Sequence, residues 1–357
     1  MKIRDLRQYY RDLMEGKRQT LSDNFLLAAL QSLAVIYGIV MRLRAFLFAI
    51  GLFRSRSLGV PVISVGNLTM GGTGKTPMVA FLARFLLARG KRVAVLSRGY
   101  GGSCHGTTRI VADGKEILLS AAEAGDEPYL LAATVPGLMV VIGPDRYRAG
   151  KLAAERLSPD ICILDDGFQH QRLRRDLDIL LLDCEKPFGN GRIFPAGQLR
   201  EPSSTAGRAH LIIYTRCQGT APGPAAGKPS CRAHHHLAGL VMPGAAEHHP
   251  FSILDGERVM AFAGIADPAR FFDALEEADV RLIATLAFED HTEYGDEEIA
   301  ALERLRDASR CTRLVTTEKD AVKLLPWMGR LGTLYAVPLE MRFEDDKPLM
   351  AALEKFL

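Results

Sequence analysis

Between residues 60 and 215 the chain alternates short apolar runs with longer segments whose apolar residues recur every three or four positions. Short apolar runs are typical of strands buried on both faces, and the wider spacing is typical of helices. The alternation predicts a doubly wound α/β sheet. We expect strands at 61–65, 92–97, 139–142, 161–164, 179–183 and 210–214, and helices at 77–89, 127–134 and 146–156.

A second α/β pattern begins at residue 258 and predicts a smaller domain. Residues 218–257, between the two patterns, are rich in Gly, Ala, Pro and His. Cys231 and these histidines could form a metal site, but no second cysteine stands at ligand spacing, which favours a linker. We expect an N-terminal helical segment at 1–57, a larger α/β domain at 58–217, a linker or insertion at 218–257 and a smaller α/β domain at 258–357.

The N-terminal segment is charged up to Asp23 and then lacks charged residues until Arg42. Its apolar residues fall at helical spacing, which predicts a helix that lies at a membrane interface, packs on the larger domain or spans the membrane. The uncharged length only just reaches the roughly 18 residues of a span. Arg42, Arg44, Arg54 and Arg56 interrupt or follow the apolar face, which favours the interfacial helix. A secretory signal does not fit, because the charged stretch is too long.

Composition narrows the functional classes. Hydrophobic content of 48% and charged content of 24% are typical of a soluble globular protein, and a net charge of +3 does not indicate a nucleic-acid partner. The six cysteines form no C-x-x-C pair, and Cys162 lies inside an apolar run. We therefore expect reduced thiols and a cytoplasmic compartment. Nothing indicates an obligate protein partner.

The stretch 62–76, VISVGNLTMGGTGKT, joins a predicted strand to a predicted helix through a glycine-rich loop. This order is typical of a loop that binds nucleotide phosphates through its N–H groups and a lysine, while its threonine hydroxyl binds Mg²⁺. Thr69 stands where the usual motif has its first glycine, and Met70 stands where a related variant has lysine. We expect ATP and Mg²⁺, with ATP bound by Gly71, Gly72, Thr73, Gly74, Lys75 and Thr76.

The predicted strand at 161–164 ends in Asp165 and Asp166. P-loop proteins place a carboxylate in this way beside the Mg²⁺ held by the loop threonine. A plain Asp-Gly turn is the alternative, and which aspartate faces the metal stays open. Arg98, in SRGYGG, follows another strand, so it lies at the carboxyl edge of the sheet and either pairs with a phosphate or is solvated.

Two further segments hold groups able to exchange protons. Asp126, in AGDEP, precedes a predicted helix and is most simply an N-cap. His291, in FEDH, follows a strand of the second α/β pattern, where a lone histidine is more often structural than catalytic. These residues alone do not select either side chain as catalytic.

Seven motifs occur in the order VGNLTMGGTGKTP, SRGYGG, AGDEP, DDGFQH, FGNGRIFPAGQLREP, EDH and TTEKDAVKL. Together they resemble the tetraacyldisaccharide 4′-kinase family, the lipid A pathway kinases of Gram-negative bacteria. The resemblance spans roughly residues 30 to 325. Gln198 stands where the family usually has proline, in PAGPLRE.

The resemblance implies a P-loop NTPase-like kinase that uses ATP and Mg²⁺ to phosphorylate the 4′-hydroxyl of a tetraacyl glucosamine disaccharide-1-phosphate, giving lipid IVA. It implies that Asp126 is the base and that His291 pairs with it across the domain cleft. Lys75 would act on the phosphates. Metal binding would fall to Thr76, Asp165 and Asp166, and binding of the acidic lipid head group to Arg98, Gln169, His170, Arg192 and Arg200.

The resemblance also implies a peripheral or monotopic enzyme on the cytoplasmic face of the inner membrane, with its N-terminal helix in that leaflet. Two other functions are considered. A membrane-associated P-loop ATPase switch acting on a protein partner would need a lysine in place of Met70. A non-catalytic lipid-binding protein with a vestigial nucleotide site does not explain why Lys75 and Asp165 are both present.

Overall fold

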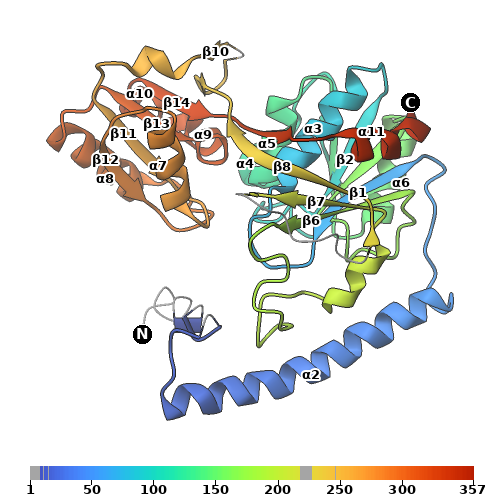
Figure 1. Ribbon diagram of the computed structural model, residues 1–357. Helices are drawn as coiled ribbons and strands as arrows, with labels where there is room; N and C mark the ends of the chain where they lie inside the picture. The colour runs from blue at the N-terminus through green and yellow to red at the C-terminus, as the bar shows by residue number, and fades with distance from the viewer. Residues whose placement is uncertain (1–8, 11, 15, 218–226, 246) are drawn as a thin grey trace. The chain divides into compact units, whose positions relative to one another are not determined.

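The computed structural model describes all residues except 1–8, 11, 15, 218–226 and 246 (Figure 1). The chain forms two compact units, and each gathers segments that are far apart in the sequence. The first unit comprises Met1–Lys75, Leu164–His234 and Phe343–Leu357, and the second comprises Thr76–Ile163 and His235–Arg342.

The first unit contains parallel strands in the order β8-β7-β6-β1. Every residue of β1 and β7 is buried, which explains why these strands read as continuous apolar runs instead of alternating ones. Their carboxyl ends lie at one edge of the sheet, so the segments after them meet there. The bounds are β1 Val62–Asn67, β6 Leu177–Asp183, β7 Leu211–Thr215 and β8 Ser230–Leu237.

Other segments of the first unit pack on these strands. Phe168 belongs to a buried cluster with Leu180, Ile212 and Leu199, so the DDGF and QLRE motifs share one core. The remaining elements are the 3₁₀ helix η1 Ser203–Arg208, β15 Leu339–Phe343, which enters the unit at its end, α11 Lys347–Leu353 and η5 Glu354–Phe356.

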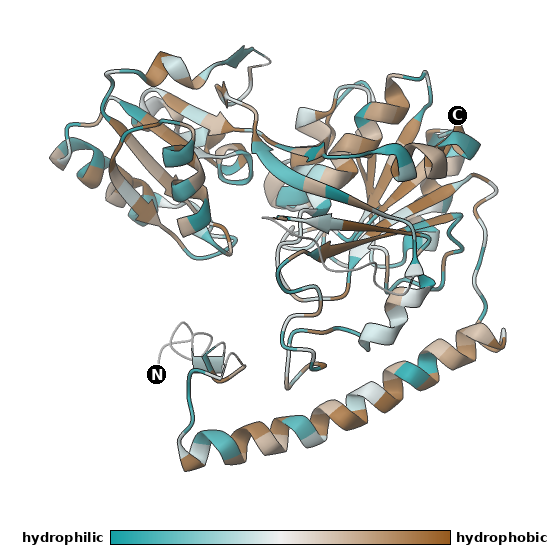
Figure 2. Cartoon of the chain, viewed as in Figure 1, coloured by the Kyte–Doolittle hydropathy of each residue, from teal (hydrophilic) through white to brown (hydrophobic). Residues whose placement is uncertain are grey.

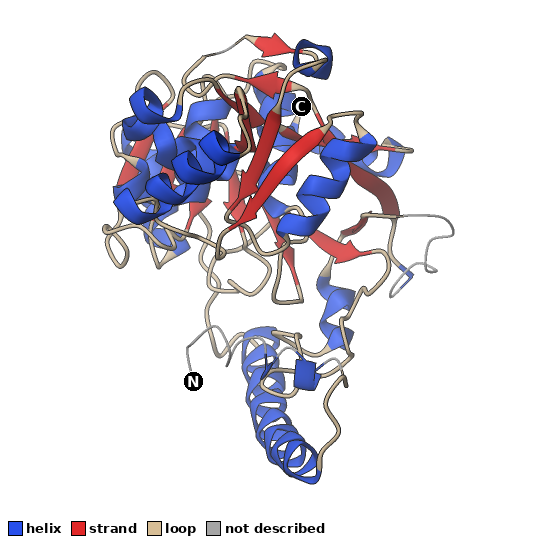
Figure 3. Cartoon of the chain, turned by 90° about the vertical axis from the view of Figure 1, so that its left-hand side faces the viewer, coloured by secondary structure: helices blue, strands red, loops and turns tan. Residues whose placement is uncertain are grey.

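The N-terminal helix α2, Leu21–Ala49, is a single unbroken helix (Figure 3). Thr20 caps it: its hydroxyl accepts from the Asp23 N–H, and the Asp23 carboxylate accepts from the Thr20 N–H. The helix ends just before Gly51, whose φ of 77° no longer fits a helix. It therefore continues through Arg42 and Arg44, so the apolar residues on either side of these arginines belong to one helix.

Most apolar side chains of α2 are exposed, and hydrophobic residues, drawn in brown, recur along the whole helix in Figure 2. Val35, Ile39 and Phe46 are 62%, 56% and 57% exposed, so the helix is not a core helix. Its opposite side contacts the first unit. Tyr37 donates to the Arg200 carbonyl (3.2 Å), and Arg44 donates to the Gln169 carbonyl (2.9 Å).

The second unit begins with parallel strands β2 and β4, which pair with antiparallel β3 in the order β2-β4-β3. Strand β5 then carries the chain into the first unit. The bounds are β2 Val93–Ser97, β3 Arg109–Asp113, β4 Met139–Ile142, β5 Ile161–Asp165, α3 Lys75–Leu87, α4 Ala121–Ala124, α5 Asp126–Thr134 and α6 Arg146–Arg156.

The rest of the second unit is a six-stranded sheet in the order β10-β9-β14-β13-β11-β12. Alternate residues of strand β11, which lies between β13 and β12, enter separate cores: Val259 and Ala261 enter one, Met260 and Phe262 the other. The bounds are β9 Leu240–Val241, β10 His248–His249, β11 Val259–Ala263, β12 Leu282–Ala287, β13 Arg313–Thr317, β14 Leu334–Val337, η3 Phe251–Leu254, α7 Pro268–Glu277, α8 Asp296–Ala308, α9 Glu318–Leu324, η4 Leu325–Trp327 and α10 Met328–Leu331.

The α/β class and the predicted parallel strands are confirmed, but five strands of the described residues were missed, namely β3, β8, β9, β10 and β15. β3 pairs antiparallel and is only partly buried, so it has no apolar run. β8 lies in the segment interpreted as a linker and includes His234, His235 and His236. Only Cys231 and Ala233 of β8 are fully buried among its eight residues, which left too weak an alternation to detect.

Cys184 and Cys217 form a disulfide. They follow the neighbouring parallel strands β6 and β7, which brings their Cα atoms to 5.0 Å. The expectation that the thiols are reduced is therefore wrong for this pair, because the sequence does not show that the two strands are adjacent. Cys104, Cys162, Cys231 and Cys311 are free.

Gly66 near the end of β1 allows a close approach of the DDGF segment. A Cβ added there would lie 2.7 Å from Phe168 Cβ and 2.8 Å from Phe168 N. Gly66→Ala should therefore lower the free energy of unfolding by roughly 1–3 kcal/mol, measured by urea denaturation. Gly207→Ala is the control, because nothing lies within 4 Å of its added Cβ. Equal stability of both variants would show that Phe168 moves freely.

Candidate active site

Three side chains hydrogen-bond to consecutive carbonyls of the glycine-rich loop. Asn67 Nδ2 donates to Gly71 O (3.4 Å), Arg216 Nη2 to Gly72 O, and Thr215 Oγ1 to Thr73 O (3.2 Å). Because a peptide plane directs its C=O and N–H to opposite sides, these bonds turn the following N–H groups away from the anchoring side chains. The Thr73 hydroxyl is buried and has no hydrogen-bond partner in the described part of the chain. The loop therefore presents donors suited to a phosphate.

Asp166 lies between two cationic side chains of the first unit. Arg200 Nη1 is 3.0 and 2.7 Å from its two carboxylate oxygens, and Lys75 Nζ is 3.8 Å from Oδ1. Asp166 adopts a φ of 53°, a left-handed conformation that few residues other than glycine take. Its side chain is about one-third exposed (34%), so this charged cluster is accessible to a ligand.

Asp165 ends β5 and is buried, with 2% exposure. In the described residues no group of three or more His, Cys, Asp or Glu could hold a metal. Mg²⁺ prefers oxygen ligands and is usually bound by one or two carboxylates together with substrate phosphates and water. The oxygens of Asp165, Asp166 and Thr76 are hard donors, so the residues present fit this ion.

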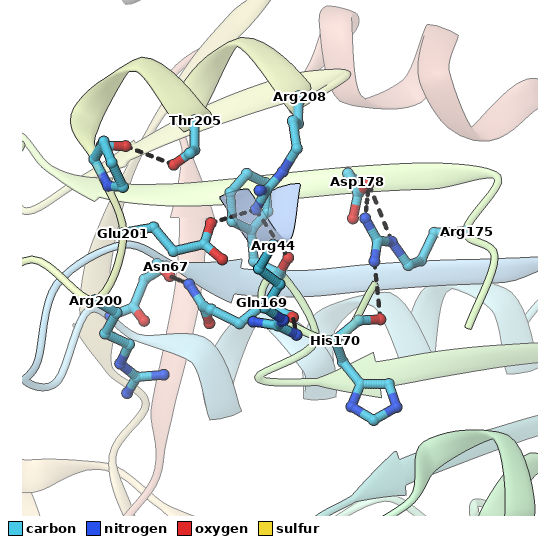
Figure 4. Close-up of polar contacts among 12 residues, drawn as sticks. Arg44, Asn67, Gln169, His170, Arg175, Asp178, Arg200, Glu201, Thr205 and Arg208 are labelled. Atoms are coloured by element: carbon cyan, nitrogen blue, oxygen red, sulfur yellow. Dashed lines mark hydrogen bonds and ion pairs between the residues drawn. The ribbon is translucent and has the colours of Figure 1, made fainter. Parts of the chain in front are cut away.

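Gln169 connects α2 to the start of the glycine-rich loop. Its carbonyl accepts from Arg44 Nη2 (2.9 Å), and its side-chain amide donates to Asn67 O (2.8 Å), as Figure 4 shows. His170 follows, and its carbonyl accepts from Arg175 Nη1 (2.9 Å). These bonds use backbone groups of the DDGFQH motif to hold the segment in place.

The FGNGRIFPAGQLREP segment lies against the same loop. Met70 N donates to Gln198 O, and Arg200 N donates to Leu68 O, both at 2.8 Å. Because the Arg200 carbonyl also accepts from Tyr37, this segment is held between α2 and the residues that enter the loop. It thereby positions the Arg200 guanidinium beside Asp166.

A separate polar cluster occurs within the second unit, around Asp126. Gly125, with a φ of 89°, is the N-cap of α5, and Asp126 is its first helical residue. The N-cap interpretation of Asp126 is therefore wrong. Its Oδ2 lies 3.2 Å from His291 Nδ1 and 2.8 Å from Lys323 Nζ. His291 has a φ of 61°, so like Asp166 it lies in the left-handed region.

The environment of Asp126 favours its charged form. Burial raises the pKa of the carboxyl group, but hydrogen bonds from His291 and Lys323, together with their charges, outweigh burial. The net effect is a pKa below the ordinary value, so Asp126 is a carboxylate at neutral pH. A carboxylate held beside a histidine can accept a proton from a hydroxyl group.

Comparison with known proteins identifies the family. Residues 26–357 match the family model described as tetraacyldisaccharide-1-P 4′-kinase. The chain belongs to this family. It is 58% identical to the tetraacyldisaccharide 4′-kinase of Geobacter metallireducens, over 94% of this chain and 99% of that protein. It is 55% identical to that of Geobacter sulfurreducens, over 98% and 99%.

A solved structure of a family member is also similar. It is the LpxK of Aquifex aeolicus, described as an "apo" form in complex with ATP, with a TM-score of 0.80 and 35% identity. The alignment covers 93% of this chain and 99% of that one. The resemblance inferred from the seven motifs is confirmed, and with it the P-loop NTPase-like α/β fold.

The structure brings together some of the residues that the family resemblance suggested. Lys75, Asp166 and Arg200 form one cluster of the first unit, and Asp126 and His291 form the expected pair in the second. Arg98 and Arg192 have exposed side chains. The catalytic, metal and substrate roles of all these residues stay predictions.

Several residues of these clusters were not found from the sequence. Asn67, Thr215 and Arg216 anchor the loop, and Lys323 contacts Asp126. Thr215 and Arg216 stand at the end of a predicted strand, a placement that could have marked them. Lys323 lies in the TTEKDAVKL motif, but nothing local links it to Asp126, because the two residues are almost 200 positions apart.

The contact between His291 and Asp126 predicts a measurable effect. His291→Ala should raise the pKa of Asp126, because a hydrogen bond that stabilises the carboxylate is lost. A pH titration of the Asp126 side-chain carbon by ¹³C NMR measures this. His105→Ala, which removes an exposed histidine, should leave the midpoint unchanged. An unchanged midpoint in His291→Ala would argue against the pair in solution.

Proposed function

We propose that the chain is a tetraacyldisaccharide 4′-kinase, which transfers the γ-phosphate of ATP to the 4′-hydroxyl of a tetraacyl glucosamine disaccharide-1-phosphate. The product is lipid IVA, in the pathway to lipid A. The observation that carries the proposal is the family match over residues 26–357. We also keep the four-part division at 1–57, 58–217, 218–257 and 258–357 as a prediction.

The donor would bind at the glycine-rich loop. The N–H groups from Gly71 to Gly74 would surround its phosphates, and Lys75 would contribute a point charge. The anchored carbonyls of the loop support this role. Thr76, Asp165 and Asp166 would hold Mg²⁺, which when bound neutralises phosphate charge during transfer.

Asp126 would be the base that takes the proton of the 4′-hydroxyl. As that oxygen bonds to the γ-phosphorus, the bond from this phosphorus to the bridging oxygen breaks and ADP leaves. In a loose transition state the bond to the attacking oxygen is little formed, so the hydroxyl proton is removed late in the reaction. A base with a low pKa is then sufficient. His291 would orient Asp126, which the 3.2 Å contact supports.

The acidic head group would meet Arg98, Gln169, His170, Arg192 and Arg200. Arginine suits a phosphate because its guanidinium donates two parallel hydrogen bonds. The exposure of Arg98 and Arg192 supports such a role. In Gln169 and His170 the backbone carbonyls are already engaged, so recognition would fall to their side chains.

The helix α2 would lie in the cytoplasmic leaflet of the inner membrane, making the enzyme monotopic. Length and composition alone would let it cross a membrane. Two contacts favour an interfacial position: Tyr37 and Arg44 bond to loops of the first unit from within the helix. A helix crossing the bilayer would carry these positions into the lipid, where such polar partners are excluded.

The kinase assignment is tested with ATP, Mg²⁺ and the disaccharide-1-phosphate lipid. The protein should yield a lipid with one added phosphate, detected by mass spectrometry. Asp126→Asn should lower kcat by about 100-fold or more while nucleotide binding is retained, because only the base is lost. Lys75→Ala should instead weaken nucleotide binding. Near-normal turnover of Asp126→Asn would refute the base.

Membrane binding is tested with phosphatidylcholine vesicles, whose neutral surface excludes simple charge attraction. The V35E/I39E double variant should reduce cosedimentation by about tenfold or more, because two apolar contacts with lipid are replaced by charges. I117E/L118E is the matched control, since it places two glutamates at exposed apolar positions outside α2. Equal binding of both variants would exclude α2 as the anchor.

The ATPase switch is not favoured by the family match. It predicts ATP hydrolysis stimulated by self-association, with no phosphorylated lipid. The same assay therefore separates the two functions.

A further inference from the structure

Two lysines of α9 face two acidic residues in the first turn of α5, and the two helices pack together within the second unit. Lys323 Nζ lies 2.8 Å from Asp126 Oδ2, and Lys319 Nζ lies 2.8 Å from Glu127 Oε1. Lys319 and Lys323 are four positions apart, so they occupy one face of the helix. The pairs are alike in distance, but only one of them includes the proposed base.

Lys323 makes a second contact that Lys319 does not share. Its ammonium group donates to the carbonyl of Thr292 at 3.1 Å. Thr292 directly follows His291, whose left-handed backbone places its ring beside Asp126. The Lys323 side chain is only 11% exposed, so it is held in this place by its surroundings. One ammonium group therefore ties the carboxylate of Asp126 to the turn that carries His291.

The contacts of Asp126 are divided unequally between its two oxygens. His291 and Lys323 both bind Oδ2, and within the described residues the hydrogen bonds and ion pairs of this side chain all involve that atom. Two donors on one oxygen fix the plane of the carboxylate. The second oxygen, Oδ1, is then oriented without taking part in the clamp.

We propose that Lys323 is a positioning residue of the phosphoryl transfer, which clamps Asp126 and the His291 turn so that Oδ1 accepts the substrate proton. This inference rests on the proposed kinase function and on Asp126 as its base. Lys323 would act through Asp126 and would not touch the substrate. Lys319, in contrast, would only join α9 to α5.

The surroundings of Asp126 define what removal of Lys323 should change. The other charged or titratable groups near this cluster are Glu127, Asp290, His291, Tyr294, Lys319 and Asp320. Glu127, Asp290, Tyr294 and Asp320 cannot carry a positive charge, so Lys323 supplies much of the positive charge near Asp126, together with Lys319 and a protonated His291. Without it, the pKa of Asp126 should rise, because a hydrogen bond and a positive charge that favour the carboxylate are lost.

The test compares Lys323→Met with Lys319→Met in the full-length protein, using the lipid phosphorylation assay over a range of pH. Lys323→Met should lower kcat by roughly 10- to 100-fold, the size of effect expected when a catalytic group is misplaced. The acidic limb of its kcat/KM profile should move to higher pH, because the base must lose its proton to act. KM for ATP should stay within about twofold. Lys319→Met should keep the wild-type profile.

Lys323→Arg is the second variant. It keeps the charge, so its acidic limb should stay closer to the wild-type position than that of Lys323→Met, even if kcat falls because the larger group displaces Thr292. This variant also carries the test if Lys323→Met does not fold, as judged by thermal melting. A ¹³C titration of Asp126 in either folded variant gives the same comparison without turnover.

The outcomes are distinct. Equal losses in Lys323→Met and Lys319→Met, with the acidic limb at the wild-type pH in both, would overturn the inference and leave Lys323 a helix-joining residue. A wild-type protein that phosphorylates no lipid would instead overturn the proposed function. A wild-type kinase with full activity in Asp126→Asn would reject the base and, with it, the clamp.

Discussion

The orientation of a few peptide planes in the glycine-rich loop is the constraint on which the first unit depends. Three consecutive carbonyls are held by Asn67, Thr215 and Arg216. These side chains come from the ends of β1 and β7, strands that are far apart in sequence but belong to one parallel sheet. The sheet therefore does more than support the loop, because its strand ends determine which way the loop N–H groups face.

In the second unit the comparable constraint is electrostatic: the charge of Asp126 depends on the groups placed around it by other elements. Burial acts to raise the pKa of the Asp126 carboxyl group, yet its hydrogen bonds with His291 and Lys323 keep the pKa low. An uncompensated charge at this position would be costly, so the partners of Asp126 stabilise the fold as well as the site. Folding of α9 against α5 and ionisation of Asp126 are consequently linked.

The sequence alone was sufficient to predict those features of the structure that are determined by residues close together in the chain. The buried strands appeared as apolar runs, and the loop from Gly71 to Thr76 was recognisable because glycine, lysine and threonine occur at fixed spacing. Asp126 and His291 were implied only by the family resemblance, since nothing local separates Asp126 from an N-cap.

What the sequence could not provide were contacts set by the tertiary fold. The partners of Lys323, the pairing of Cys184 with Cys217 and the position of Arg216 each depend on which elements become neighbours. β8 escaped detection for a different reason: half-buried strands with histidines have no clear alternation. In each case the structure depends on contacts with residues that are far away in the sequence.

The contacts of α2 have a consequence for the orientation of the protein at a lipid surface. Tyr37 and Arg44 are seven positions apart, close to two full turns, so both bonds leave the same side of the helix. They prevent α2 from rolling about its own axis. Val35, Ile39 and Phe46 project from the opposite side and are exposed, so in the proposed membrane position they would define a fixed tilt for the first unit. The helix would thus set the angle at which the glycine-rich loop of the first unit faces the water above the bilayer.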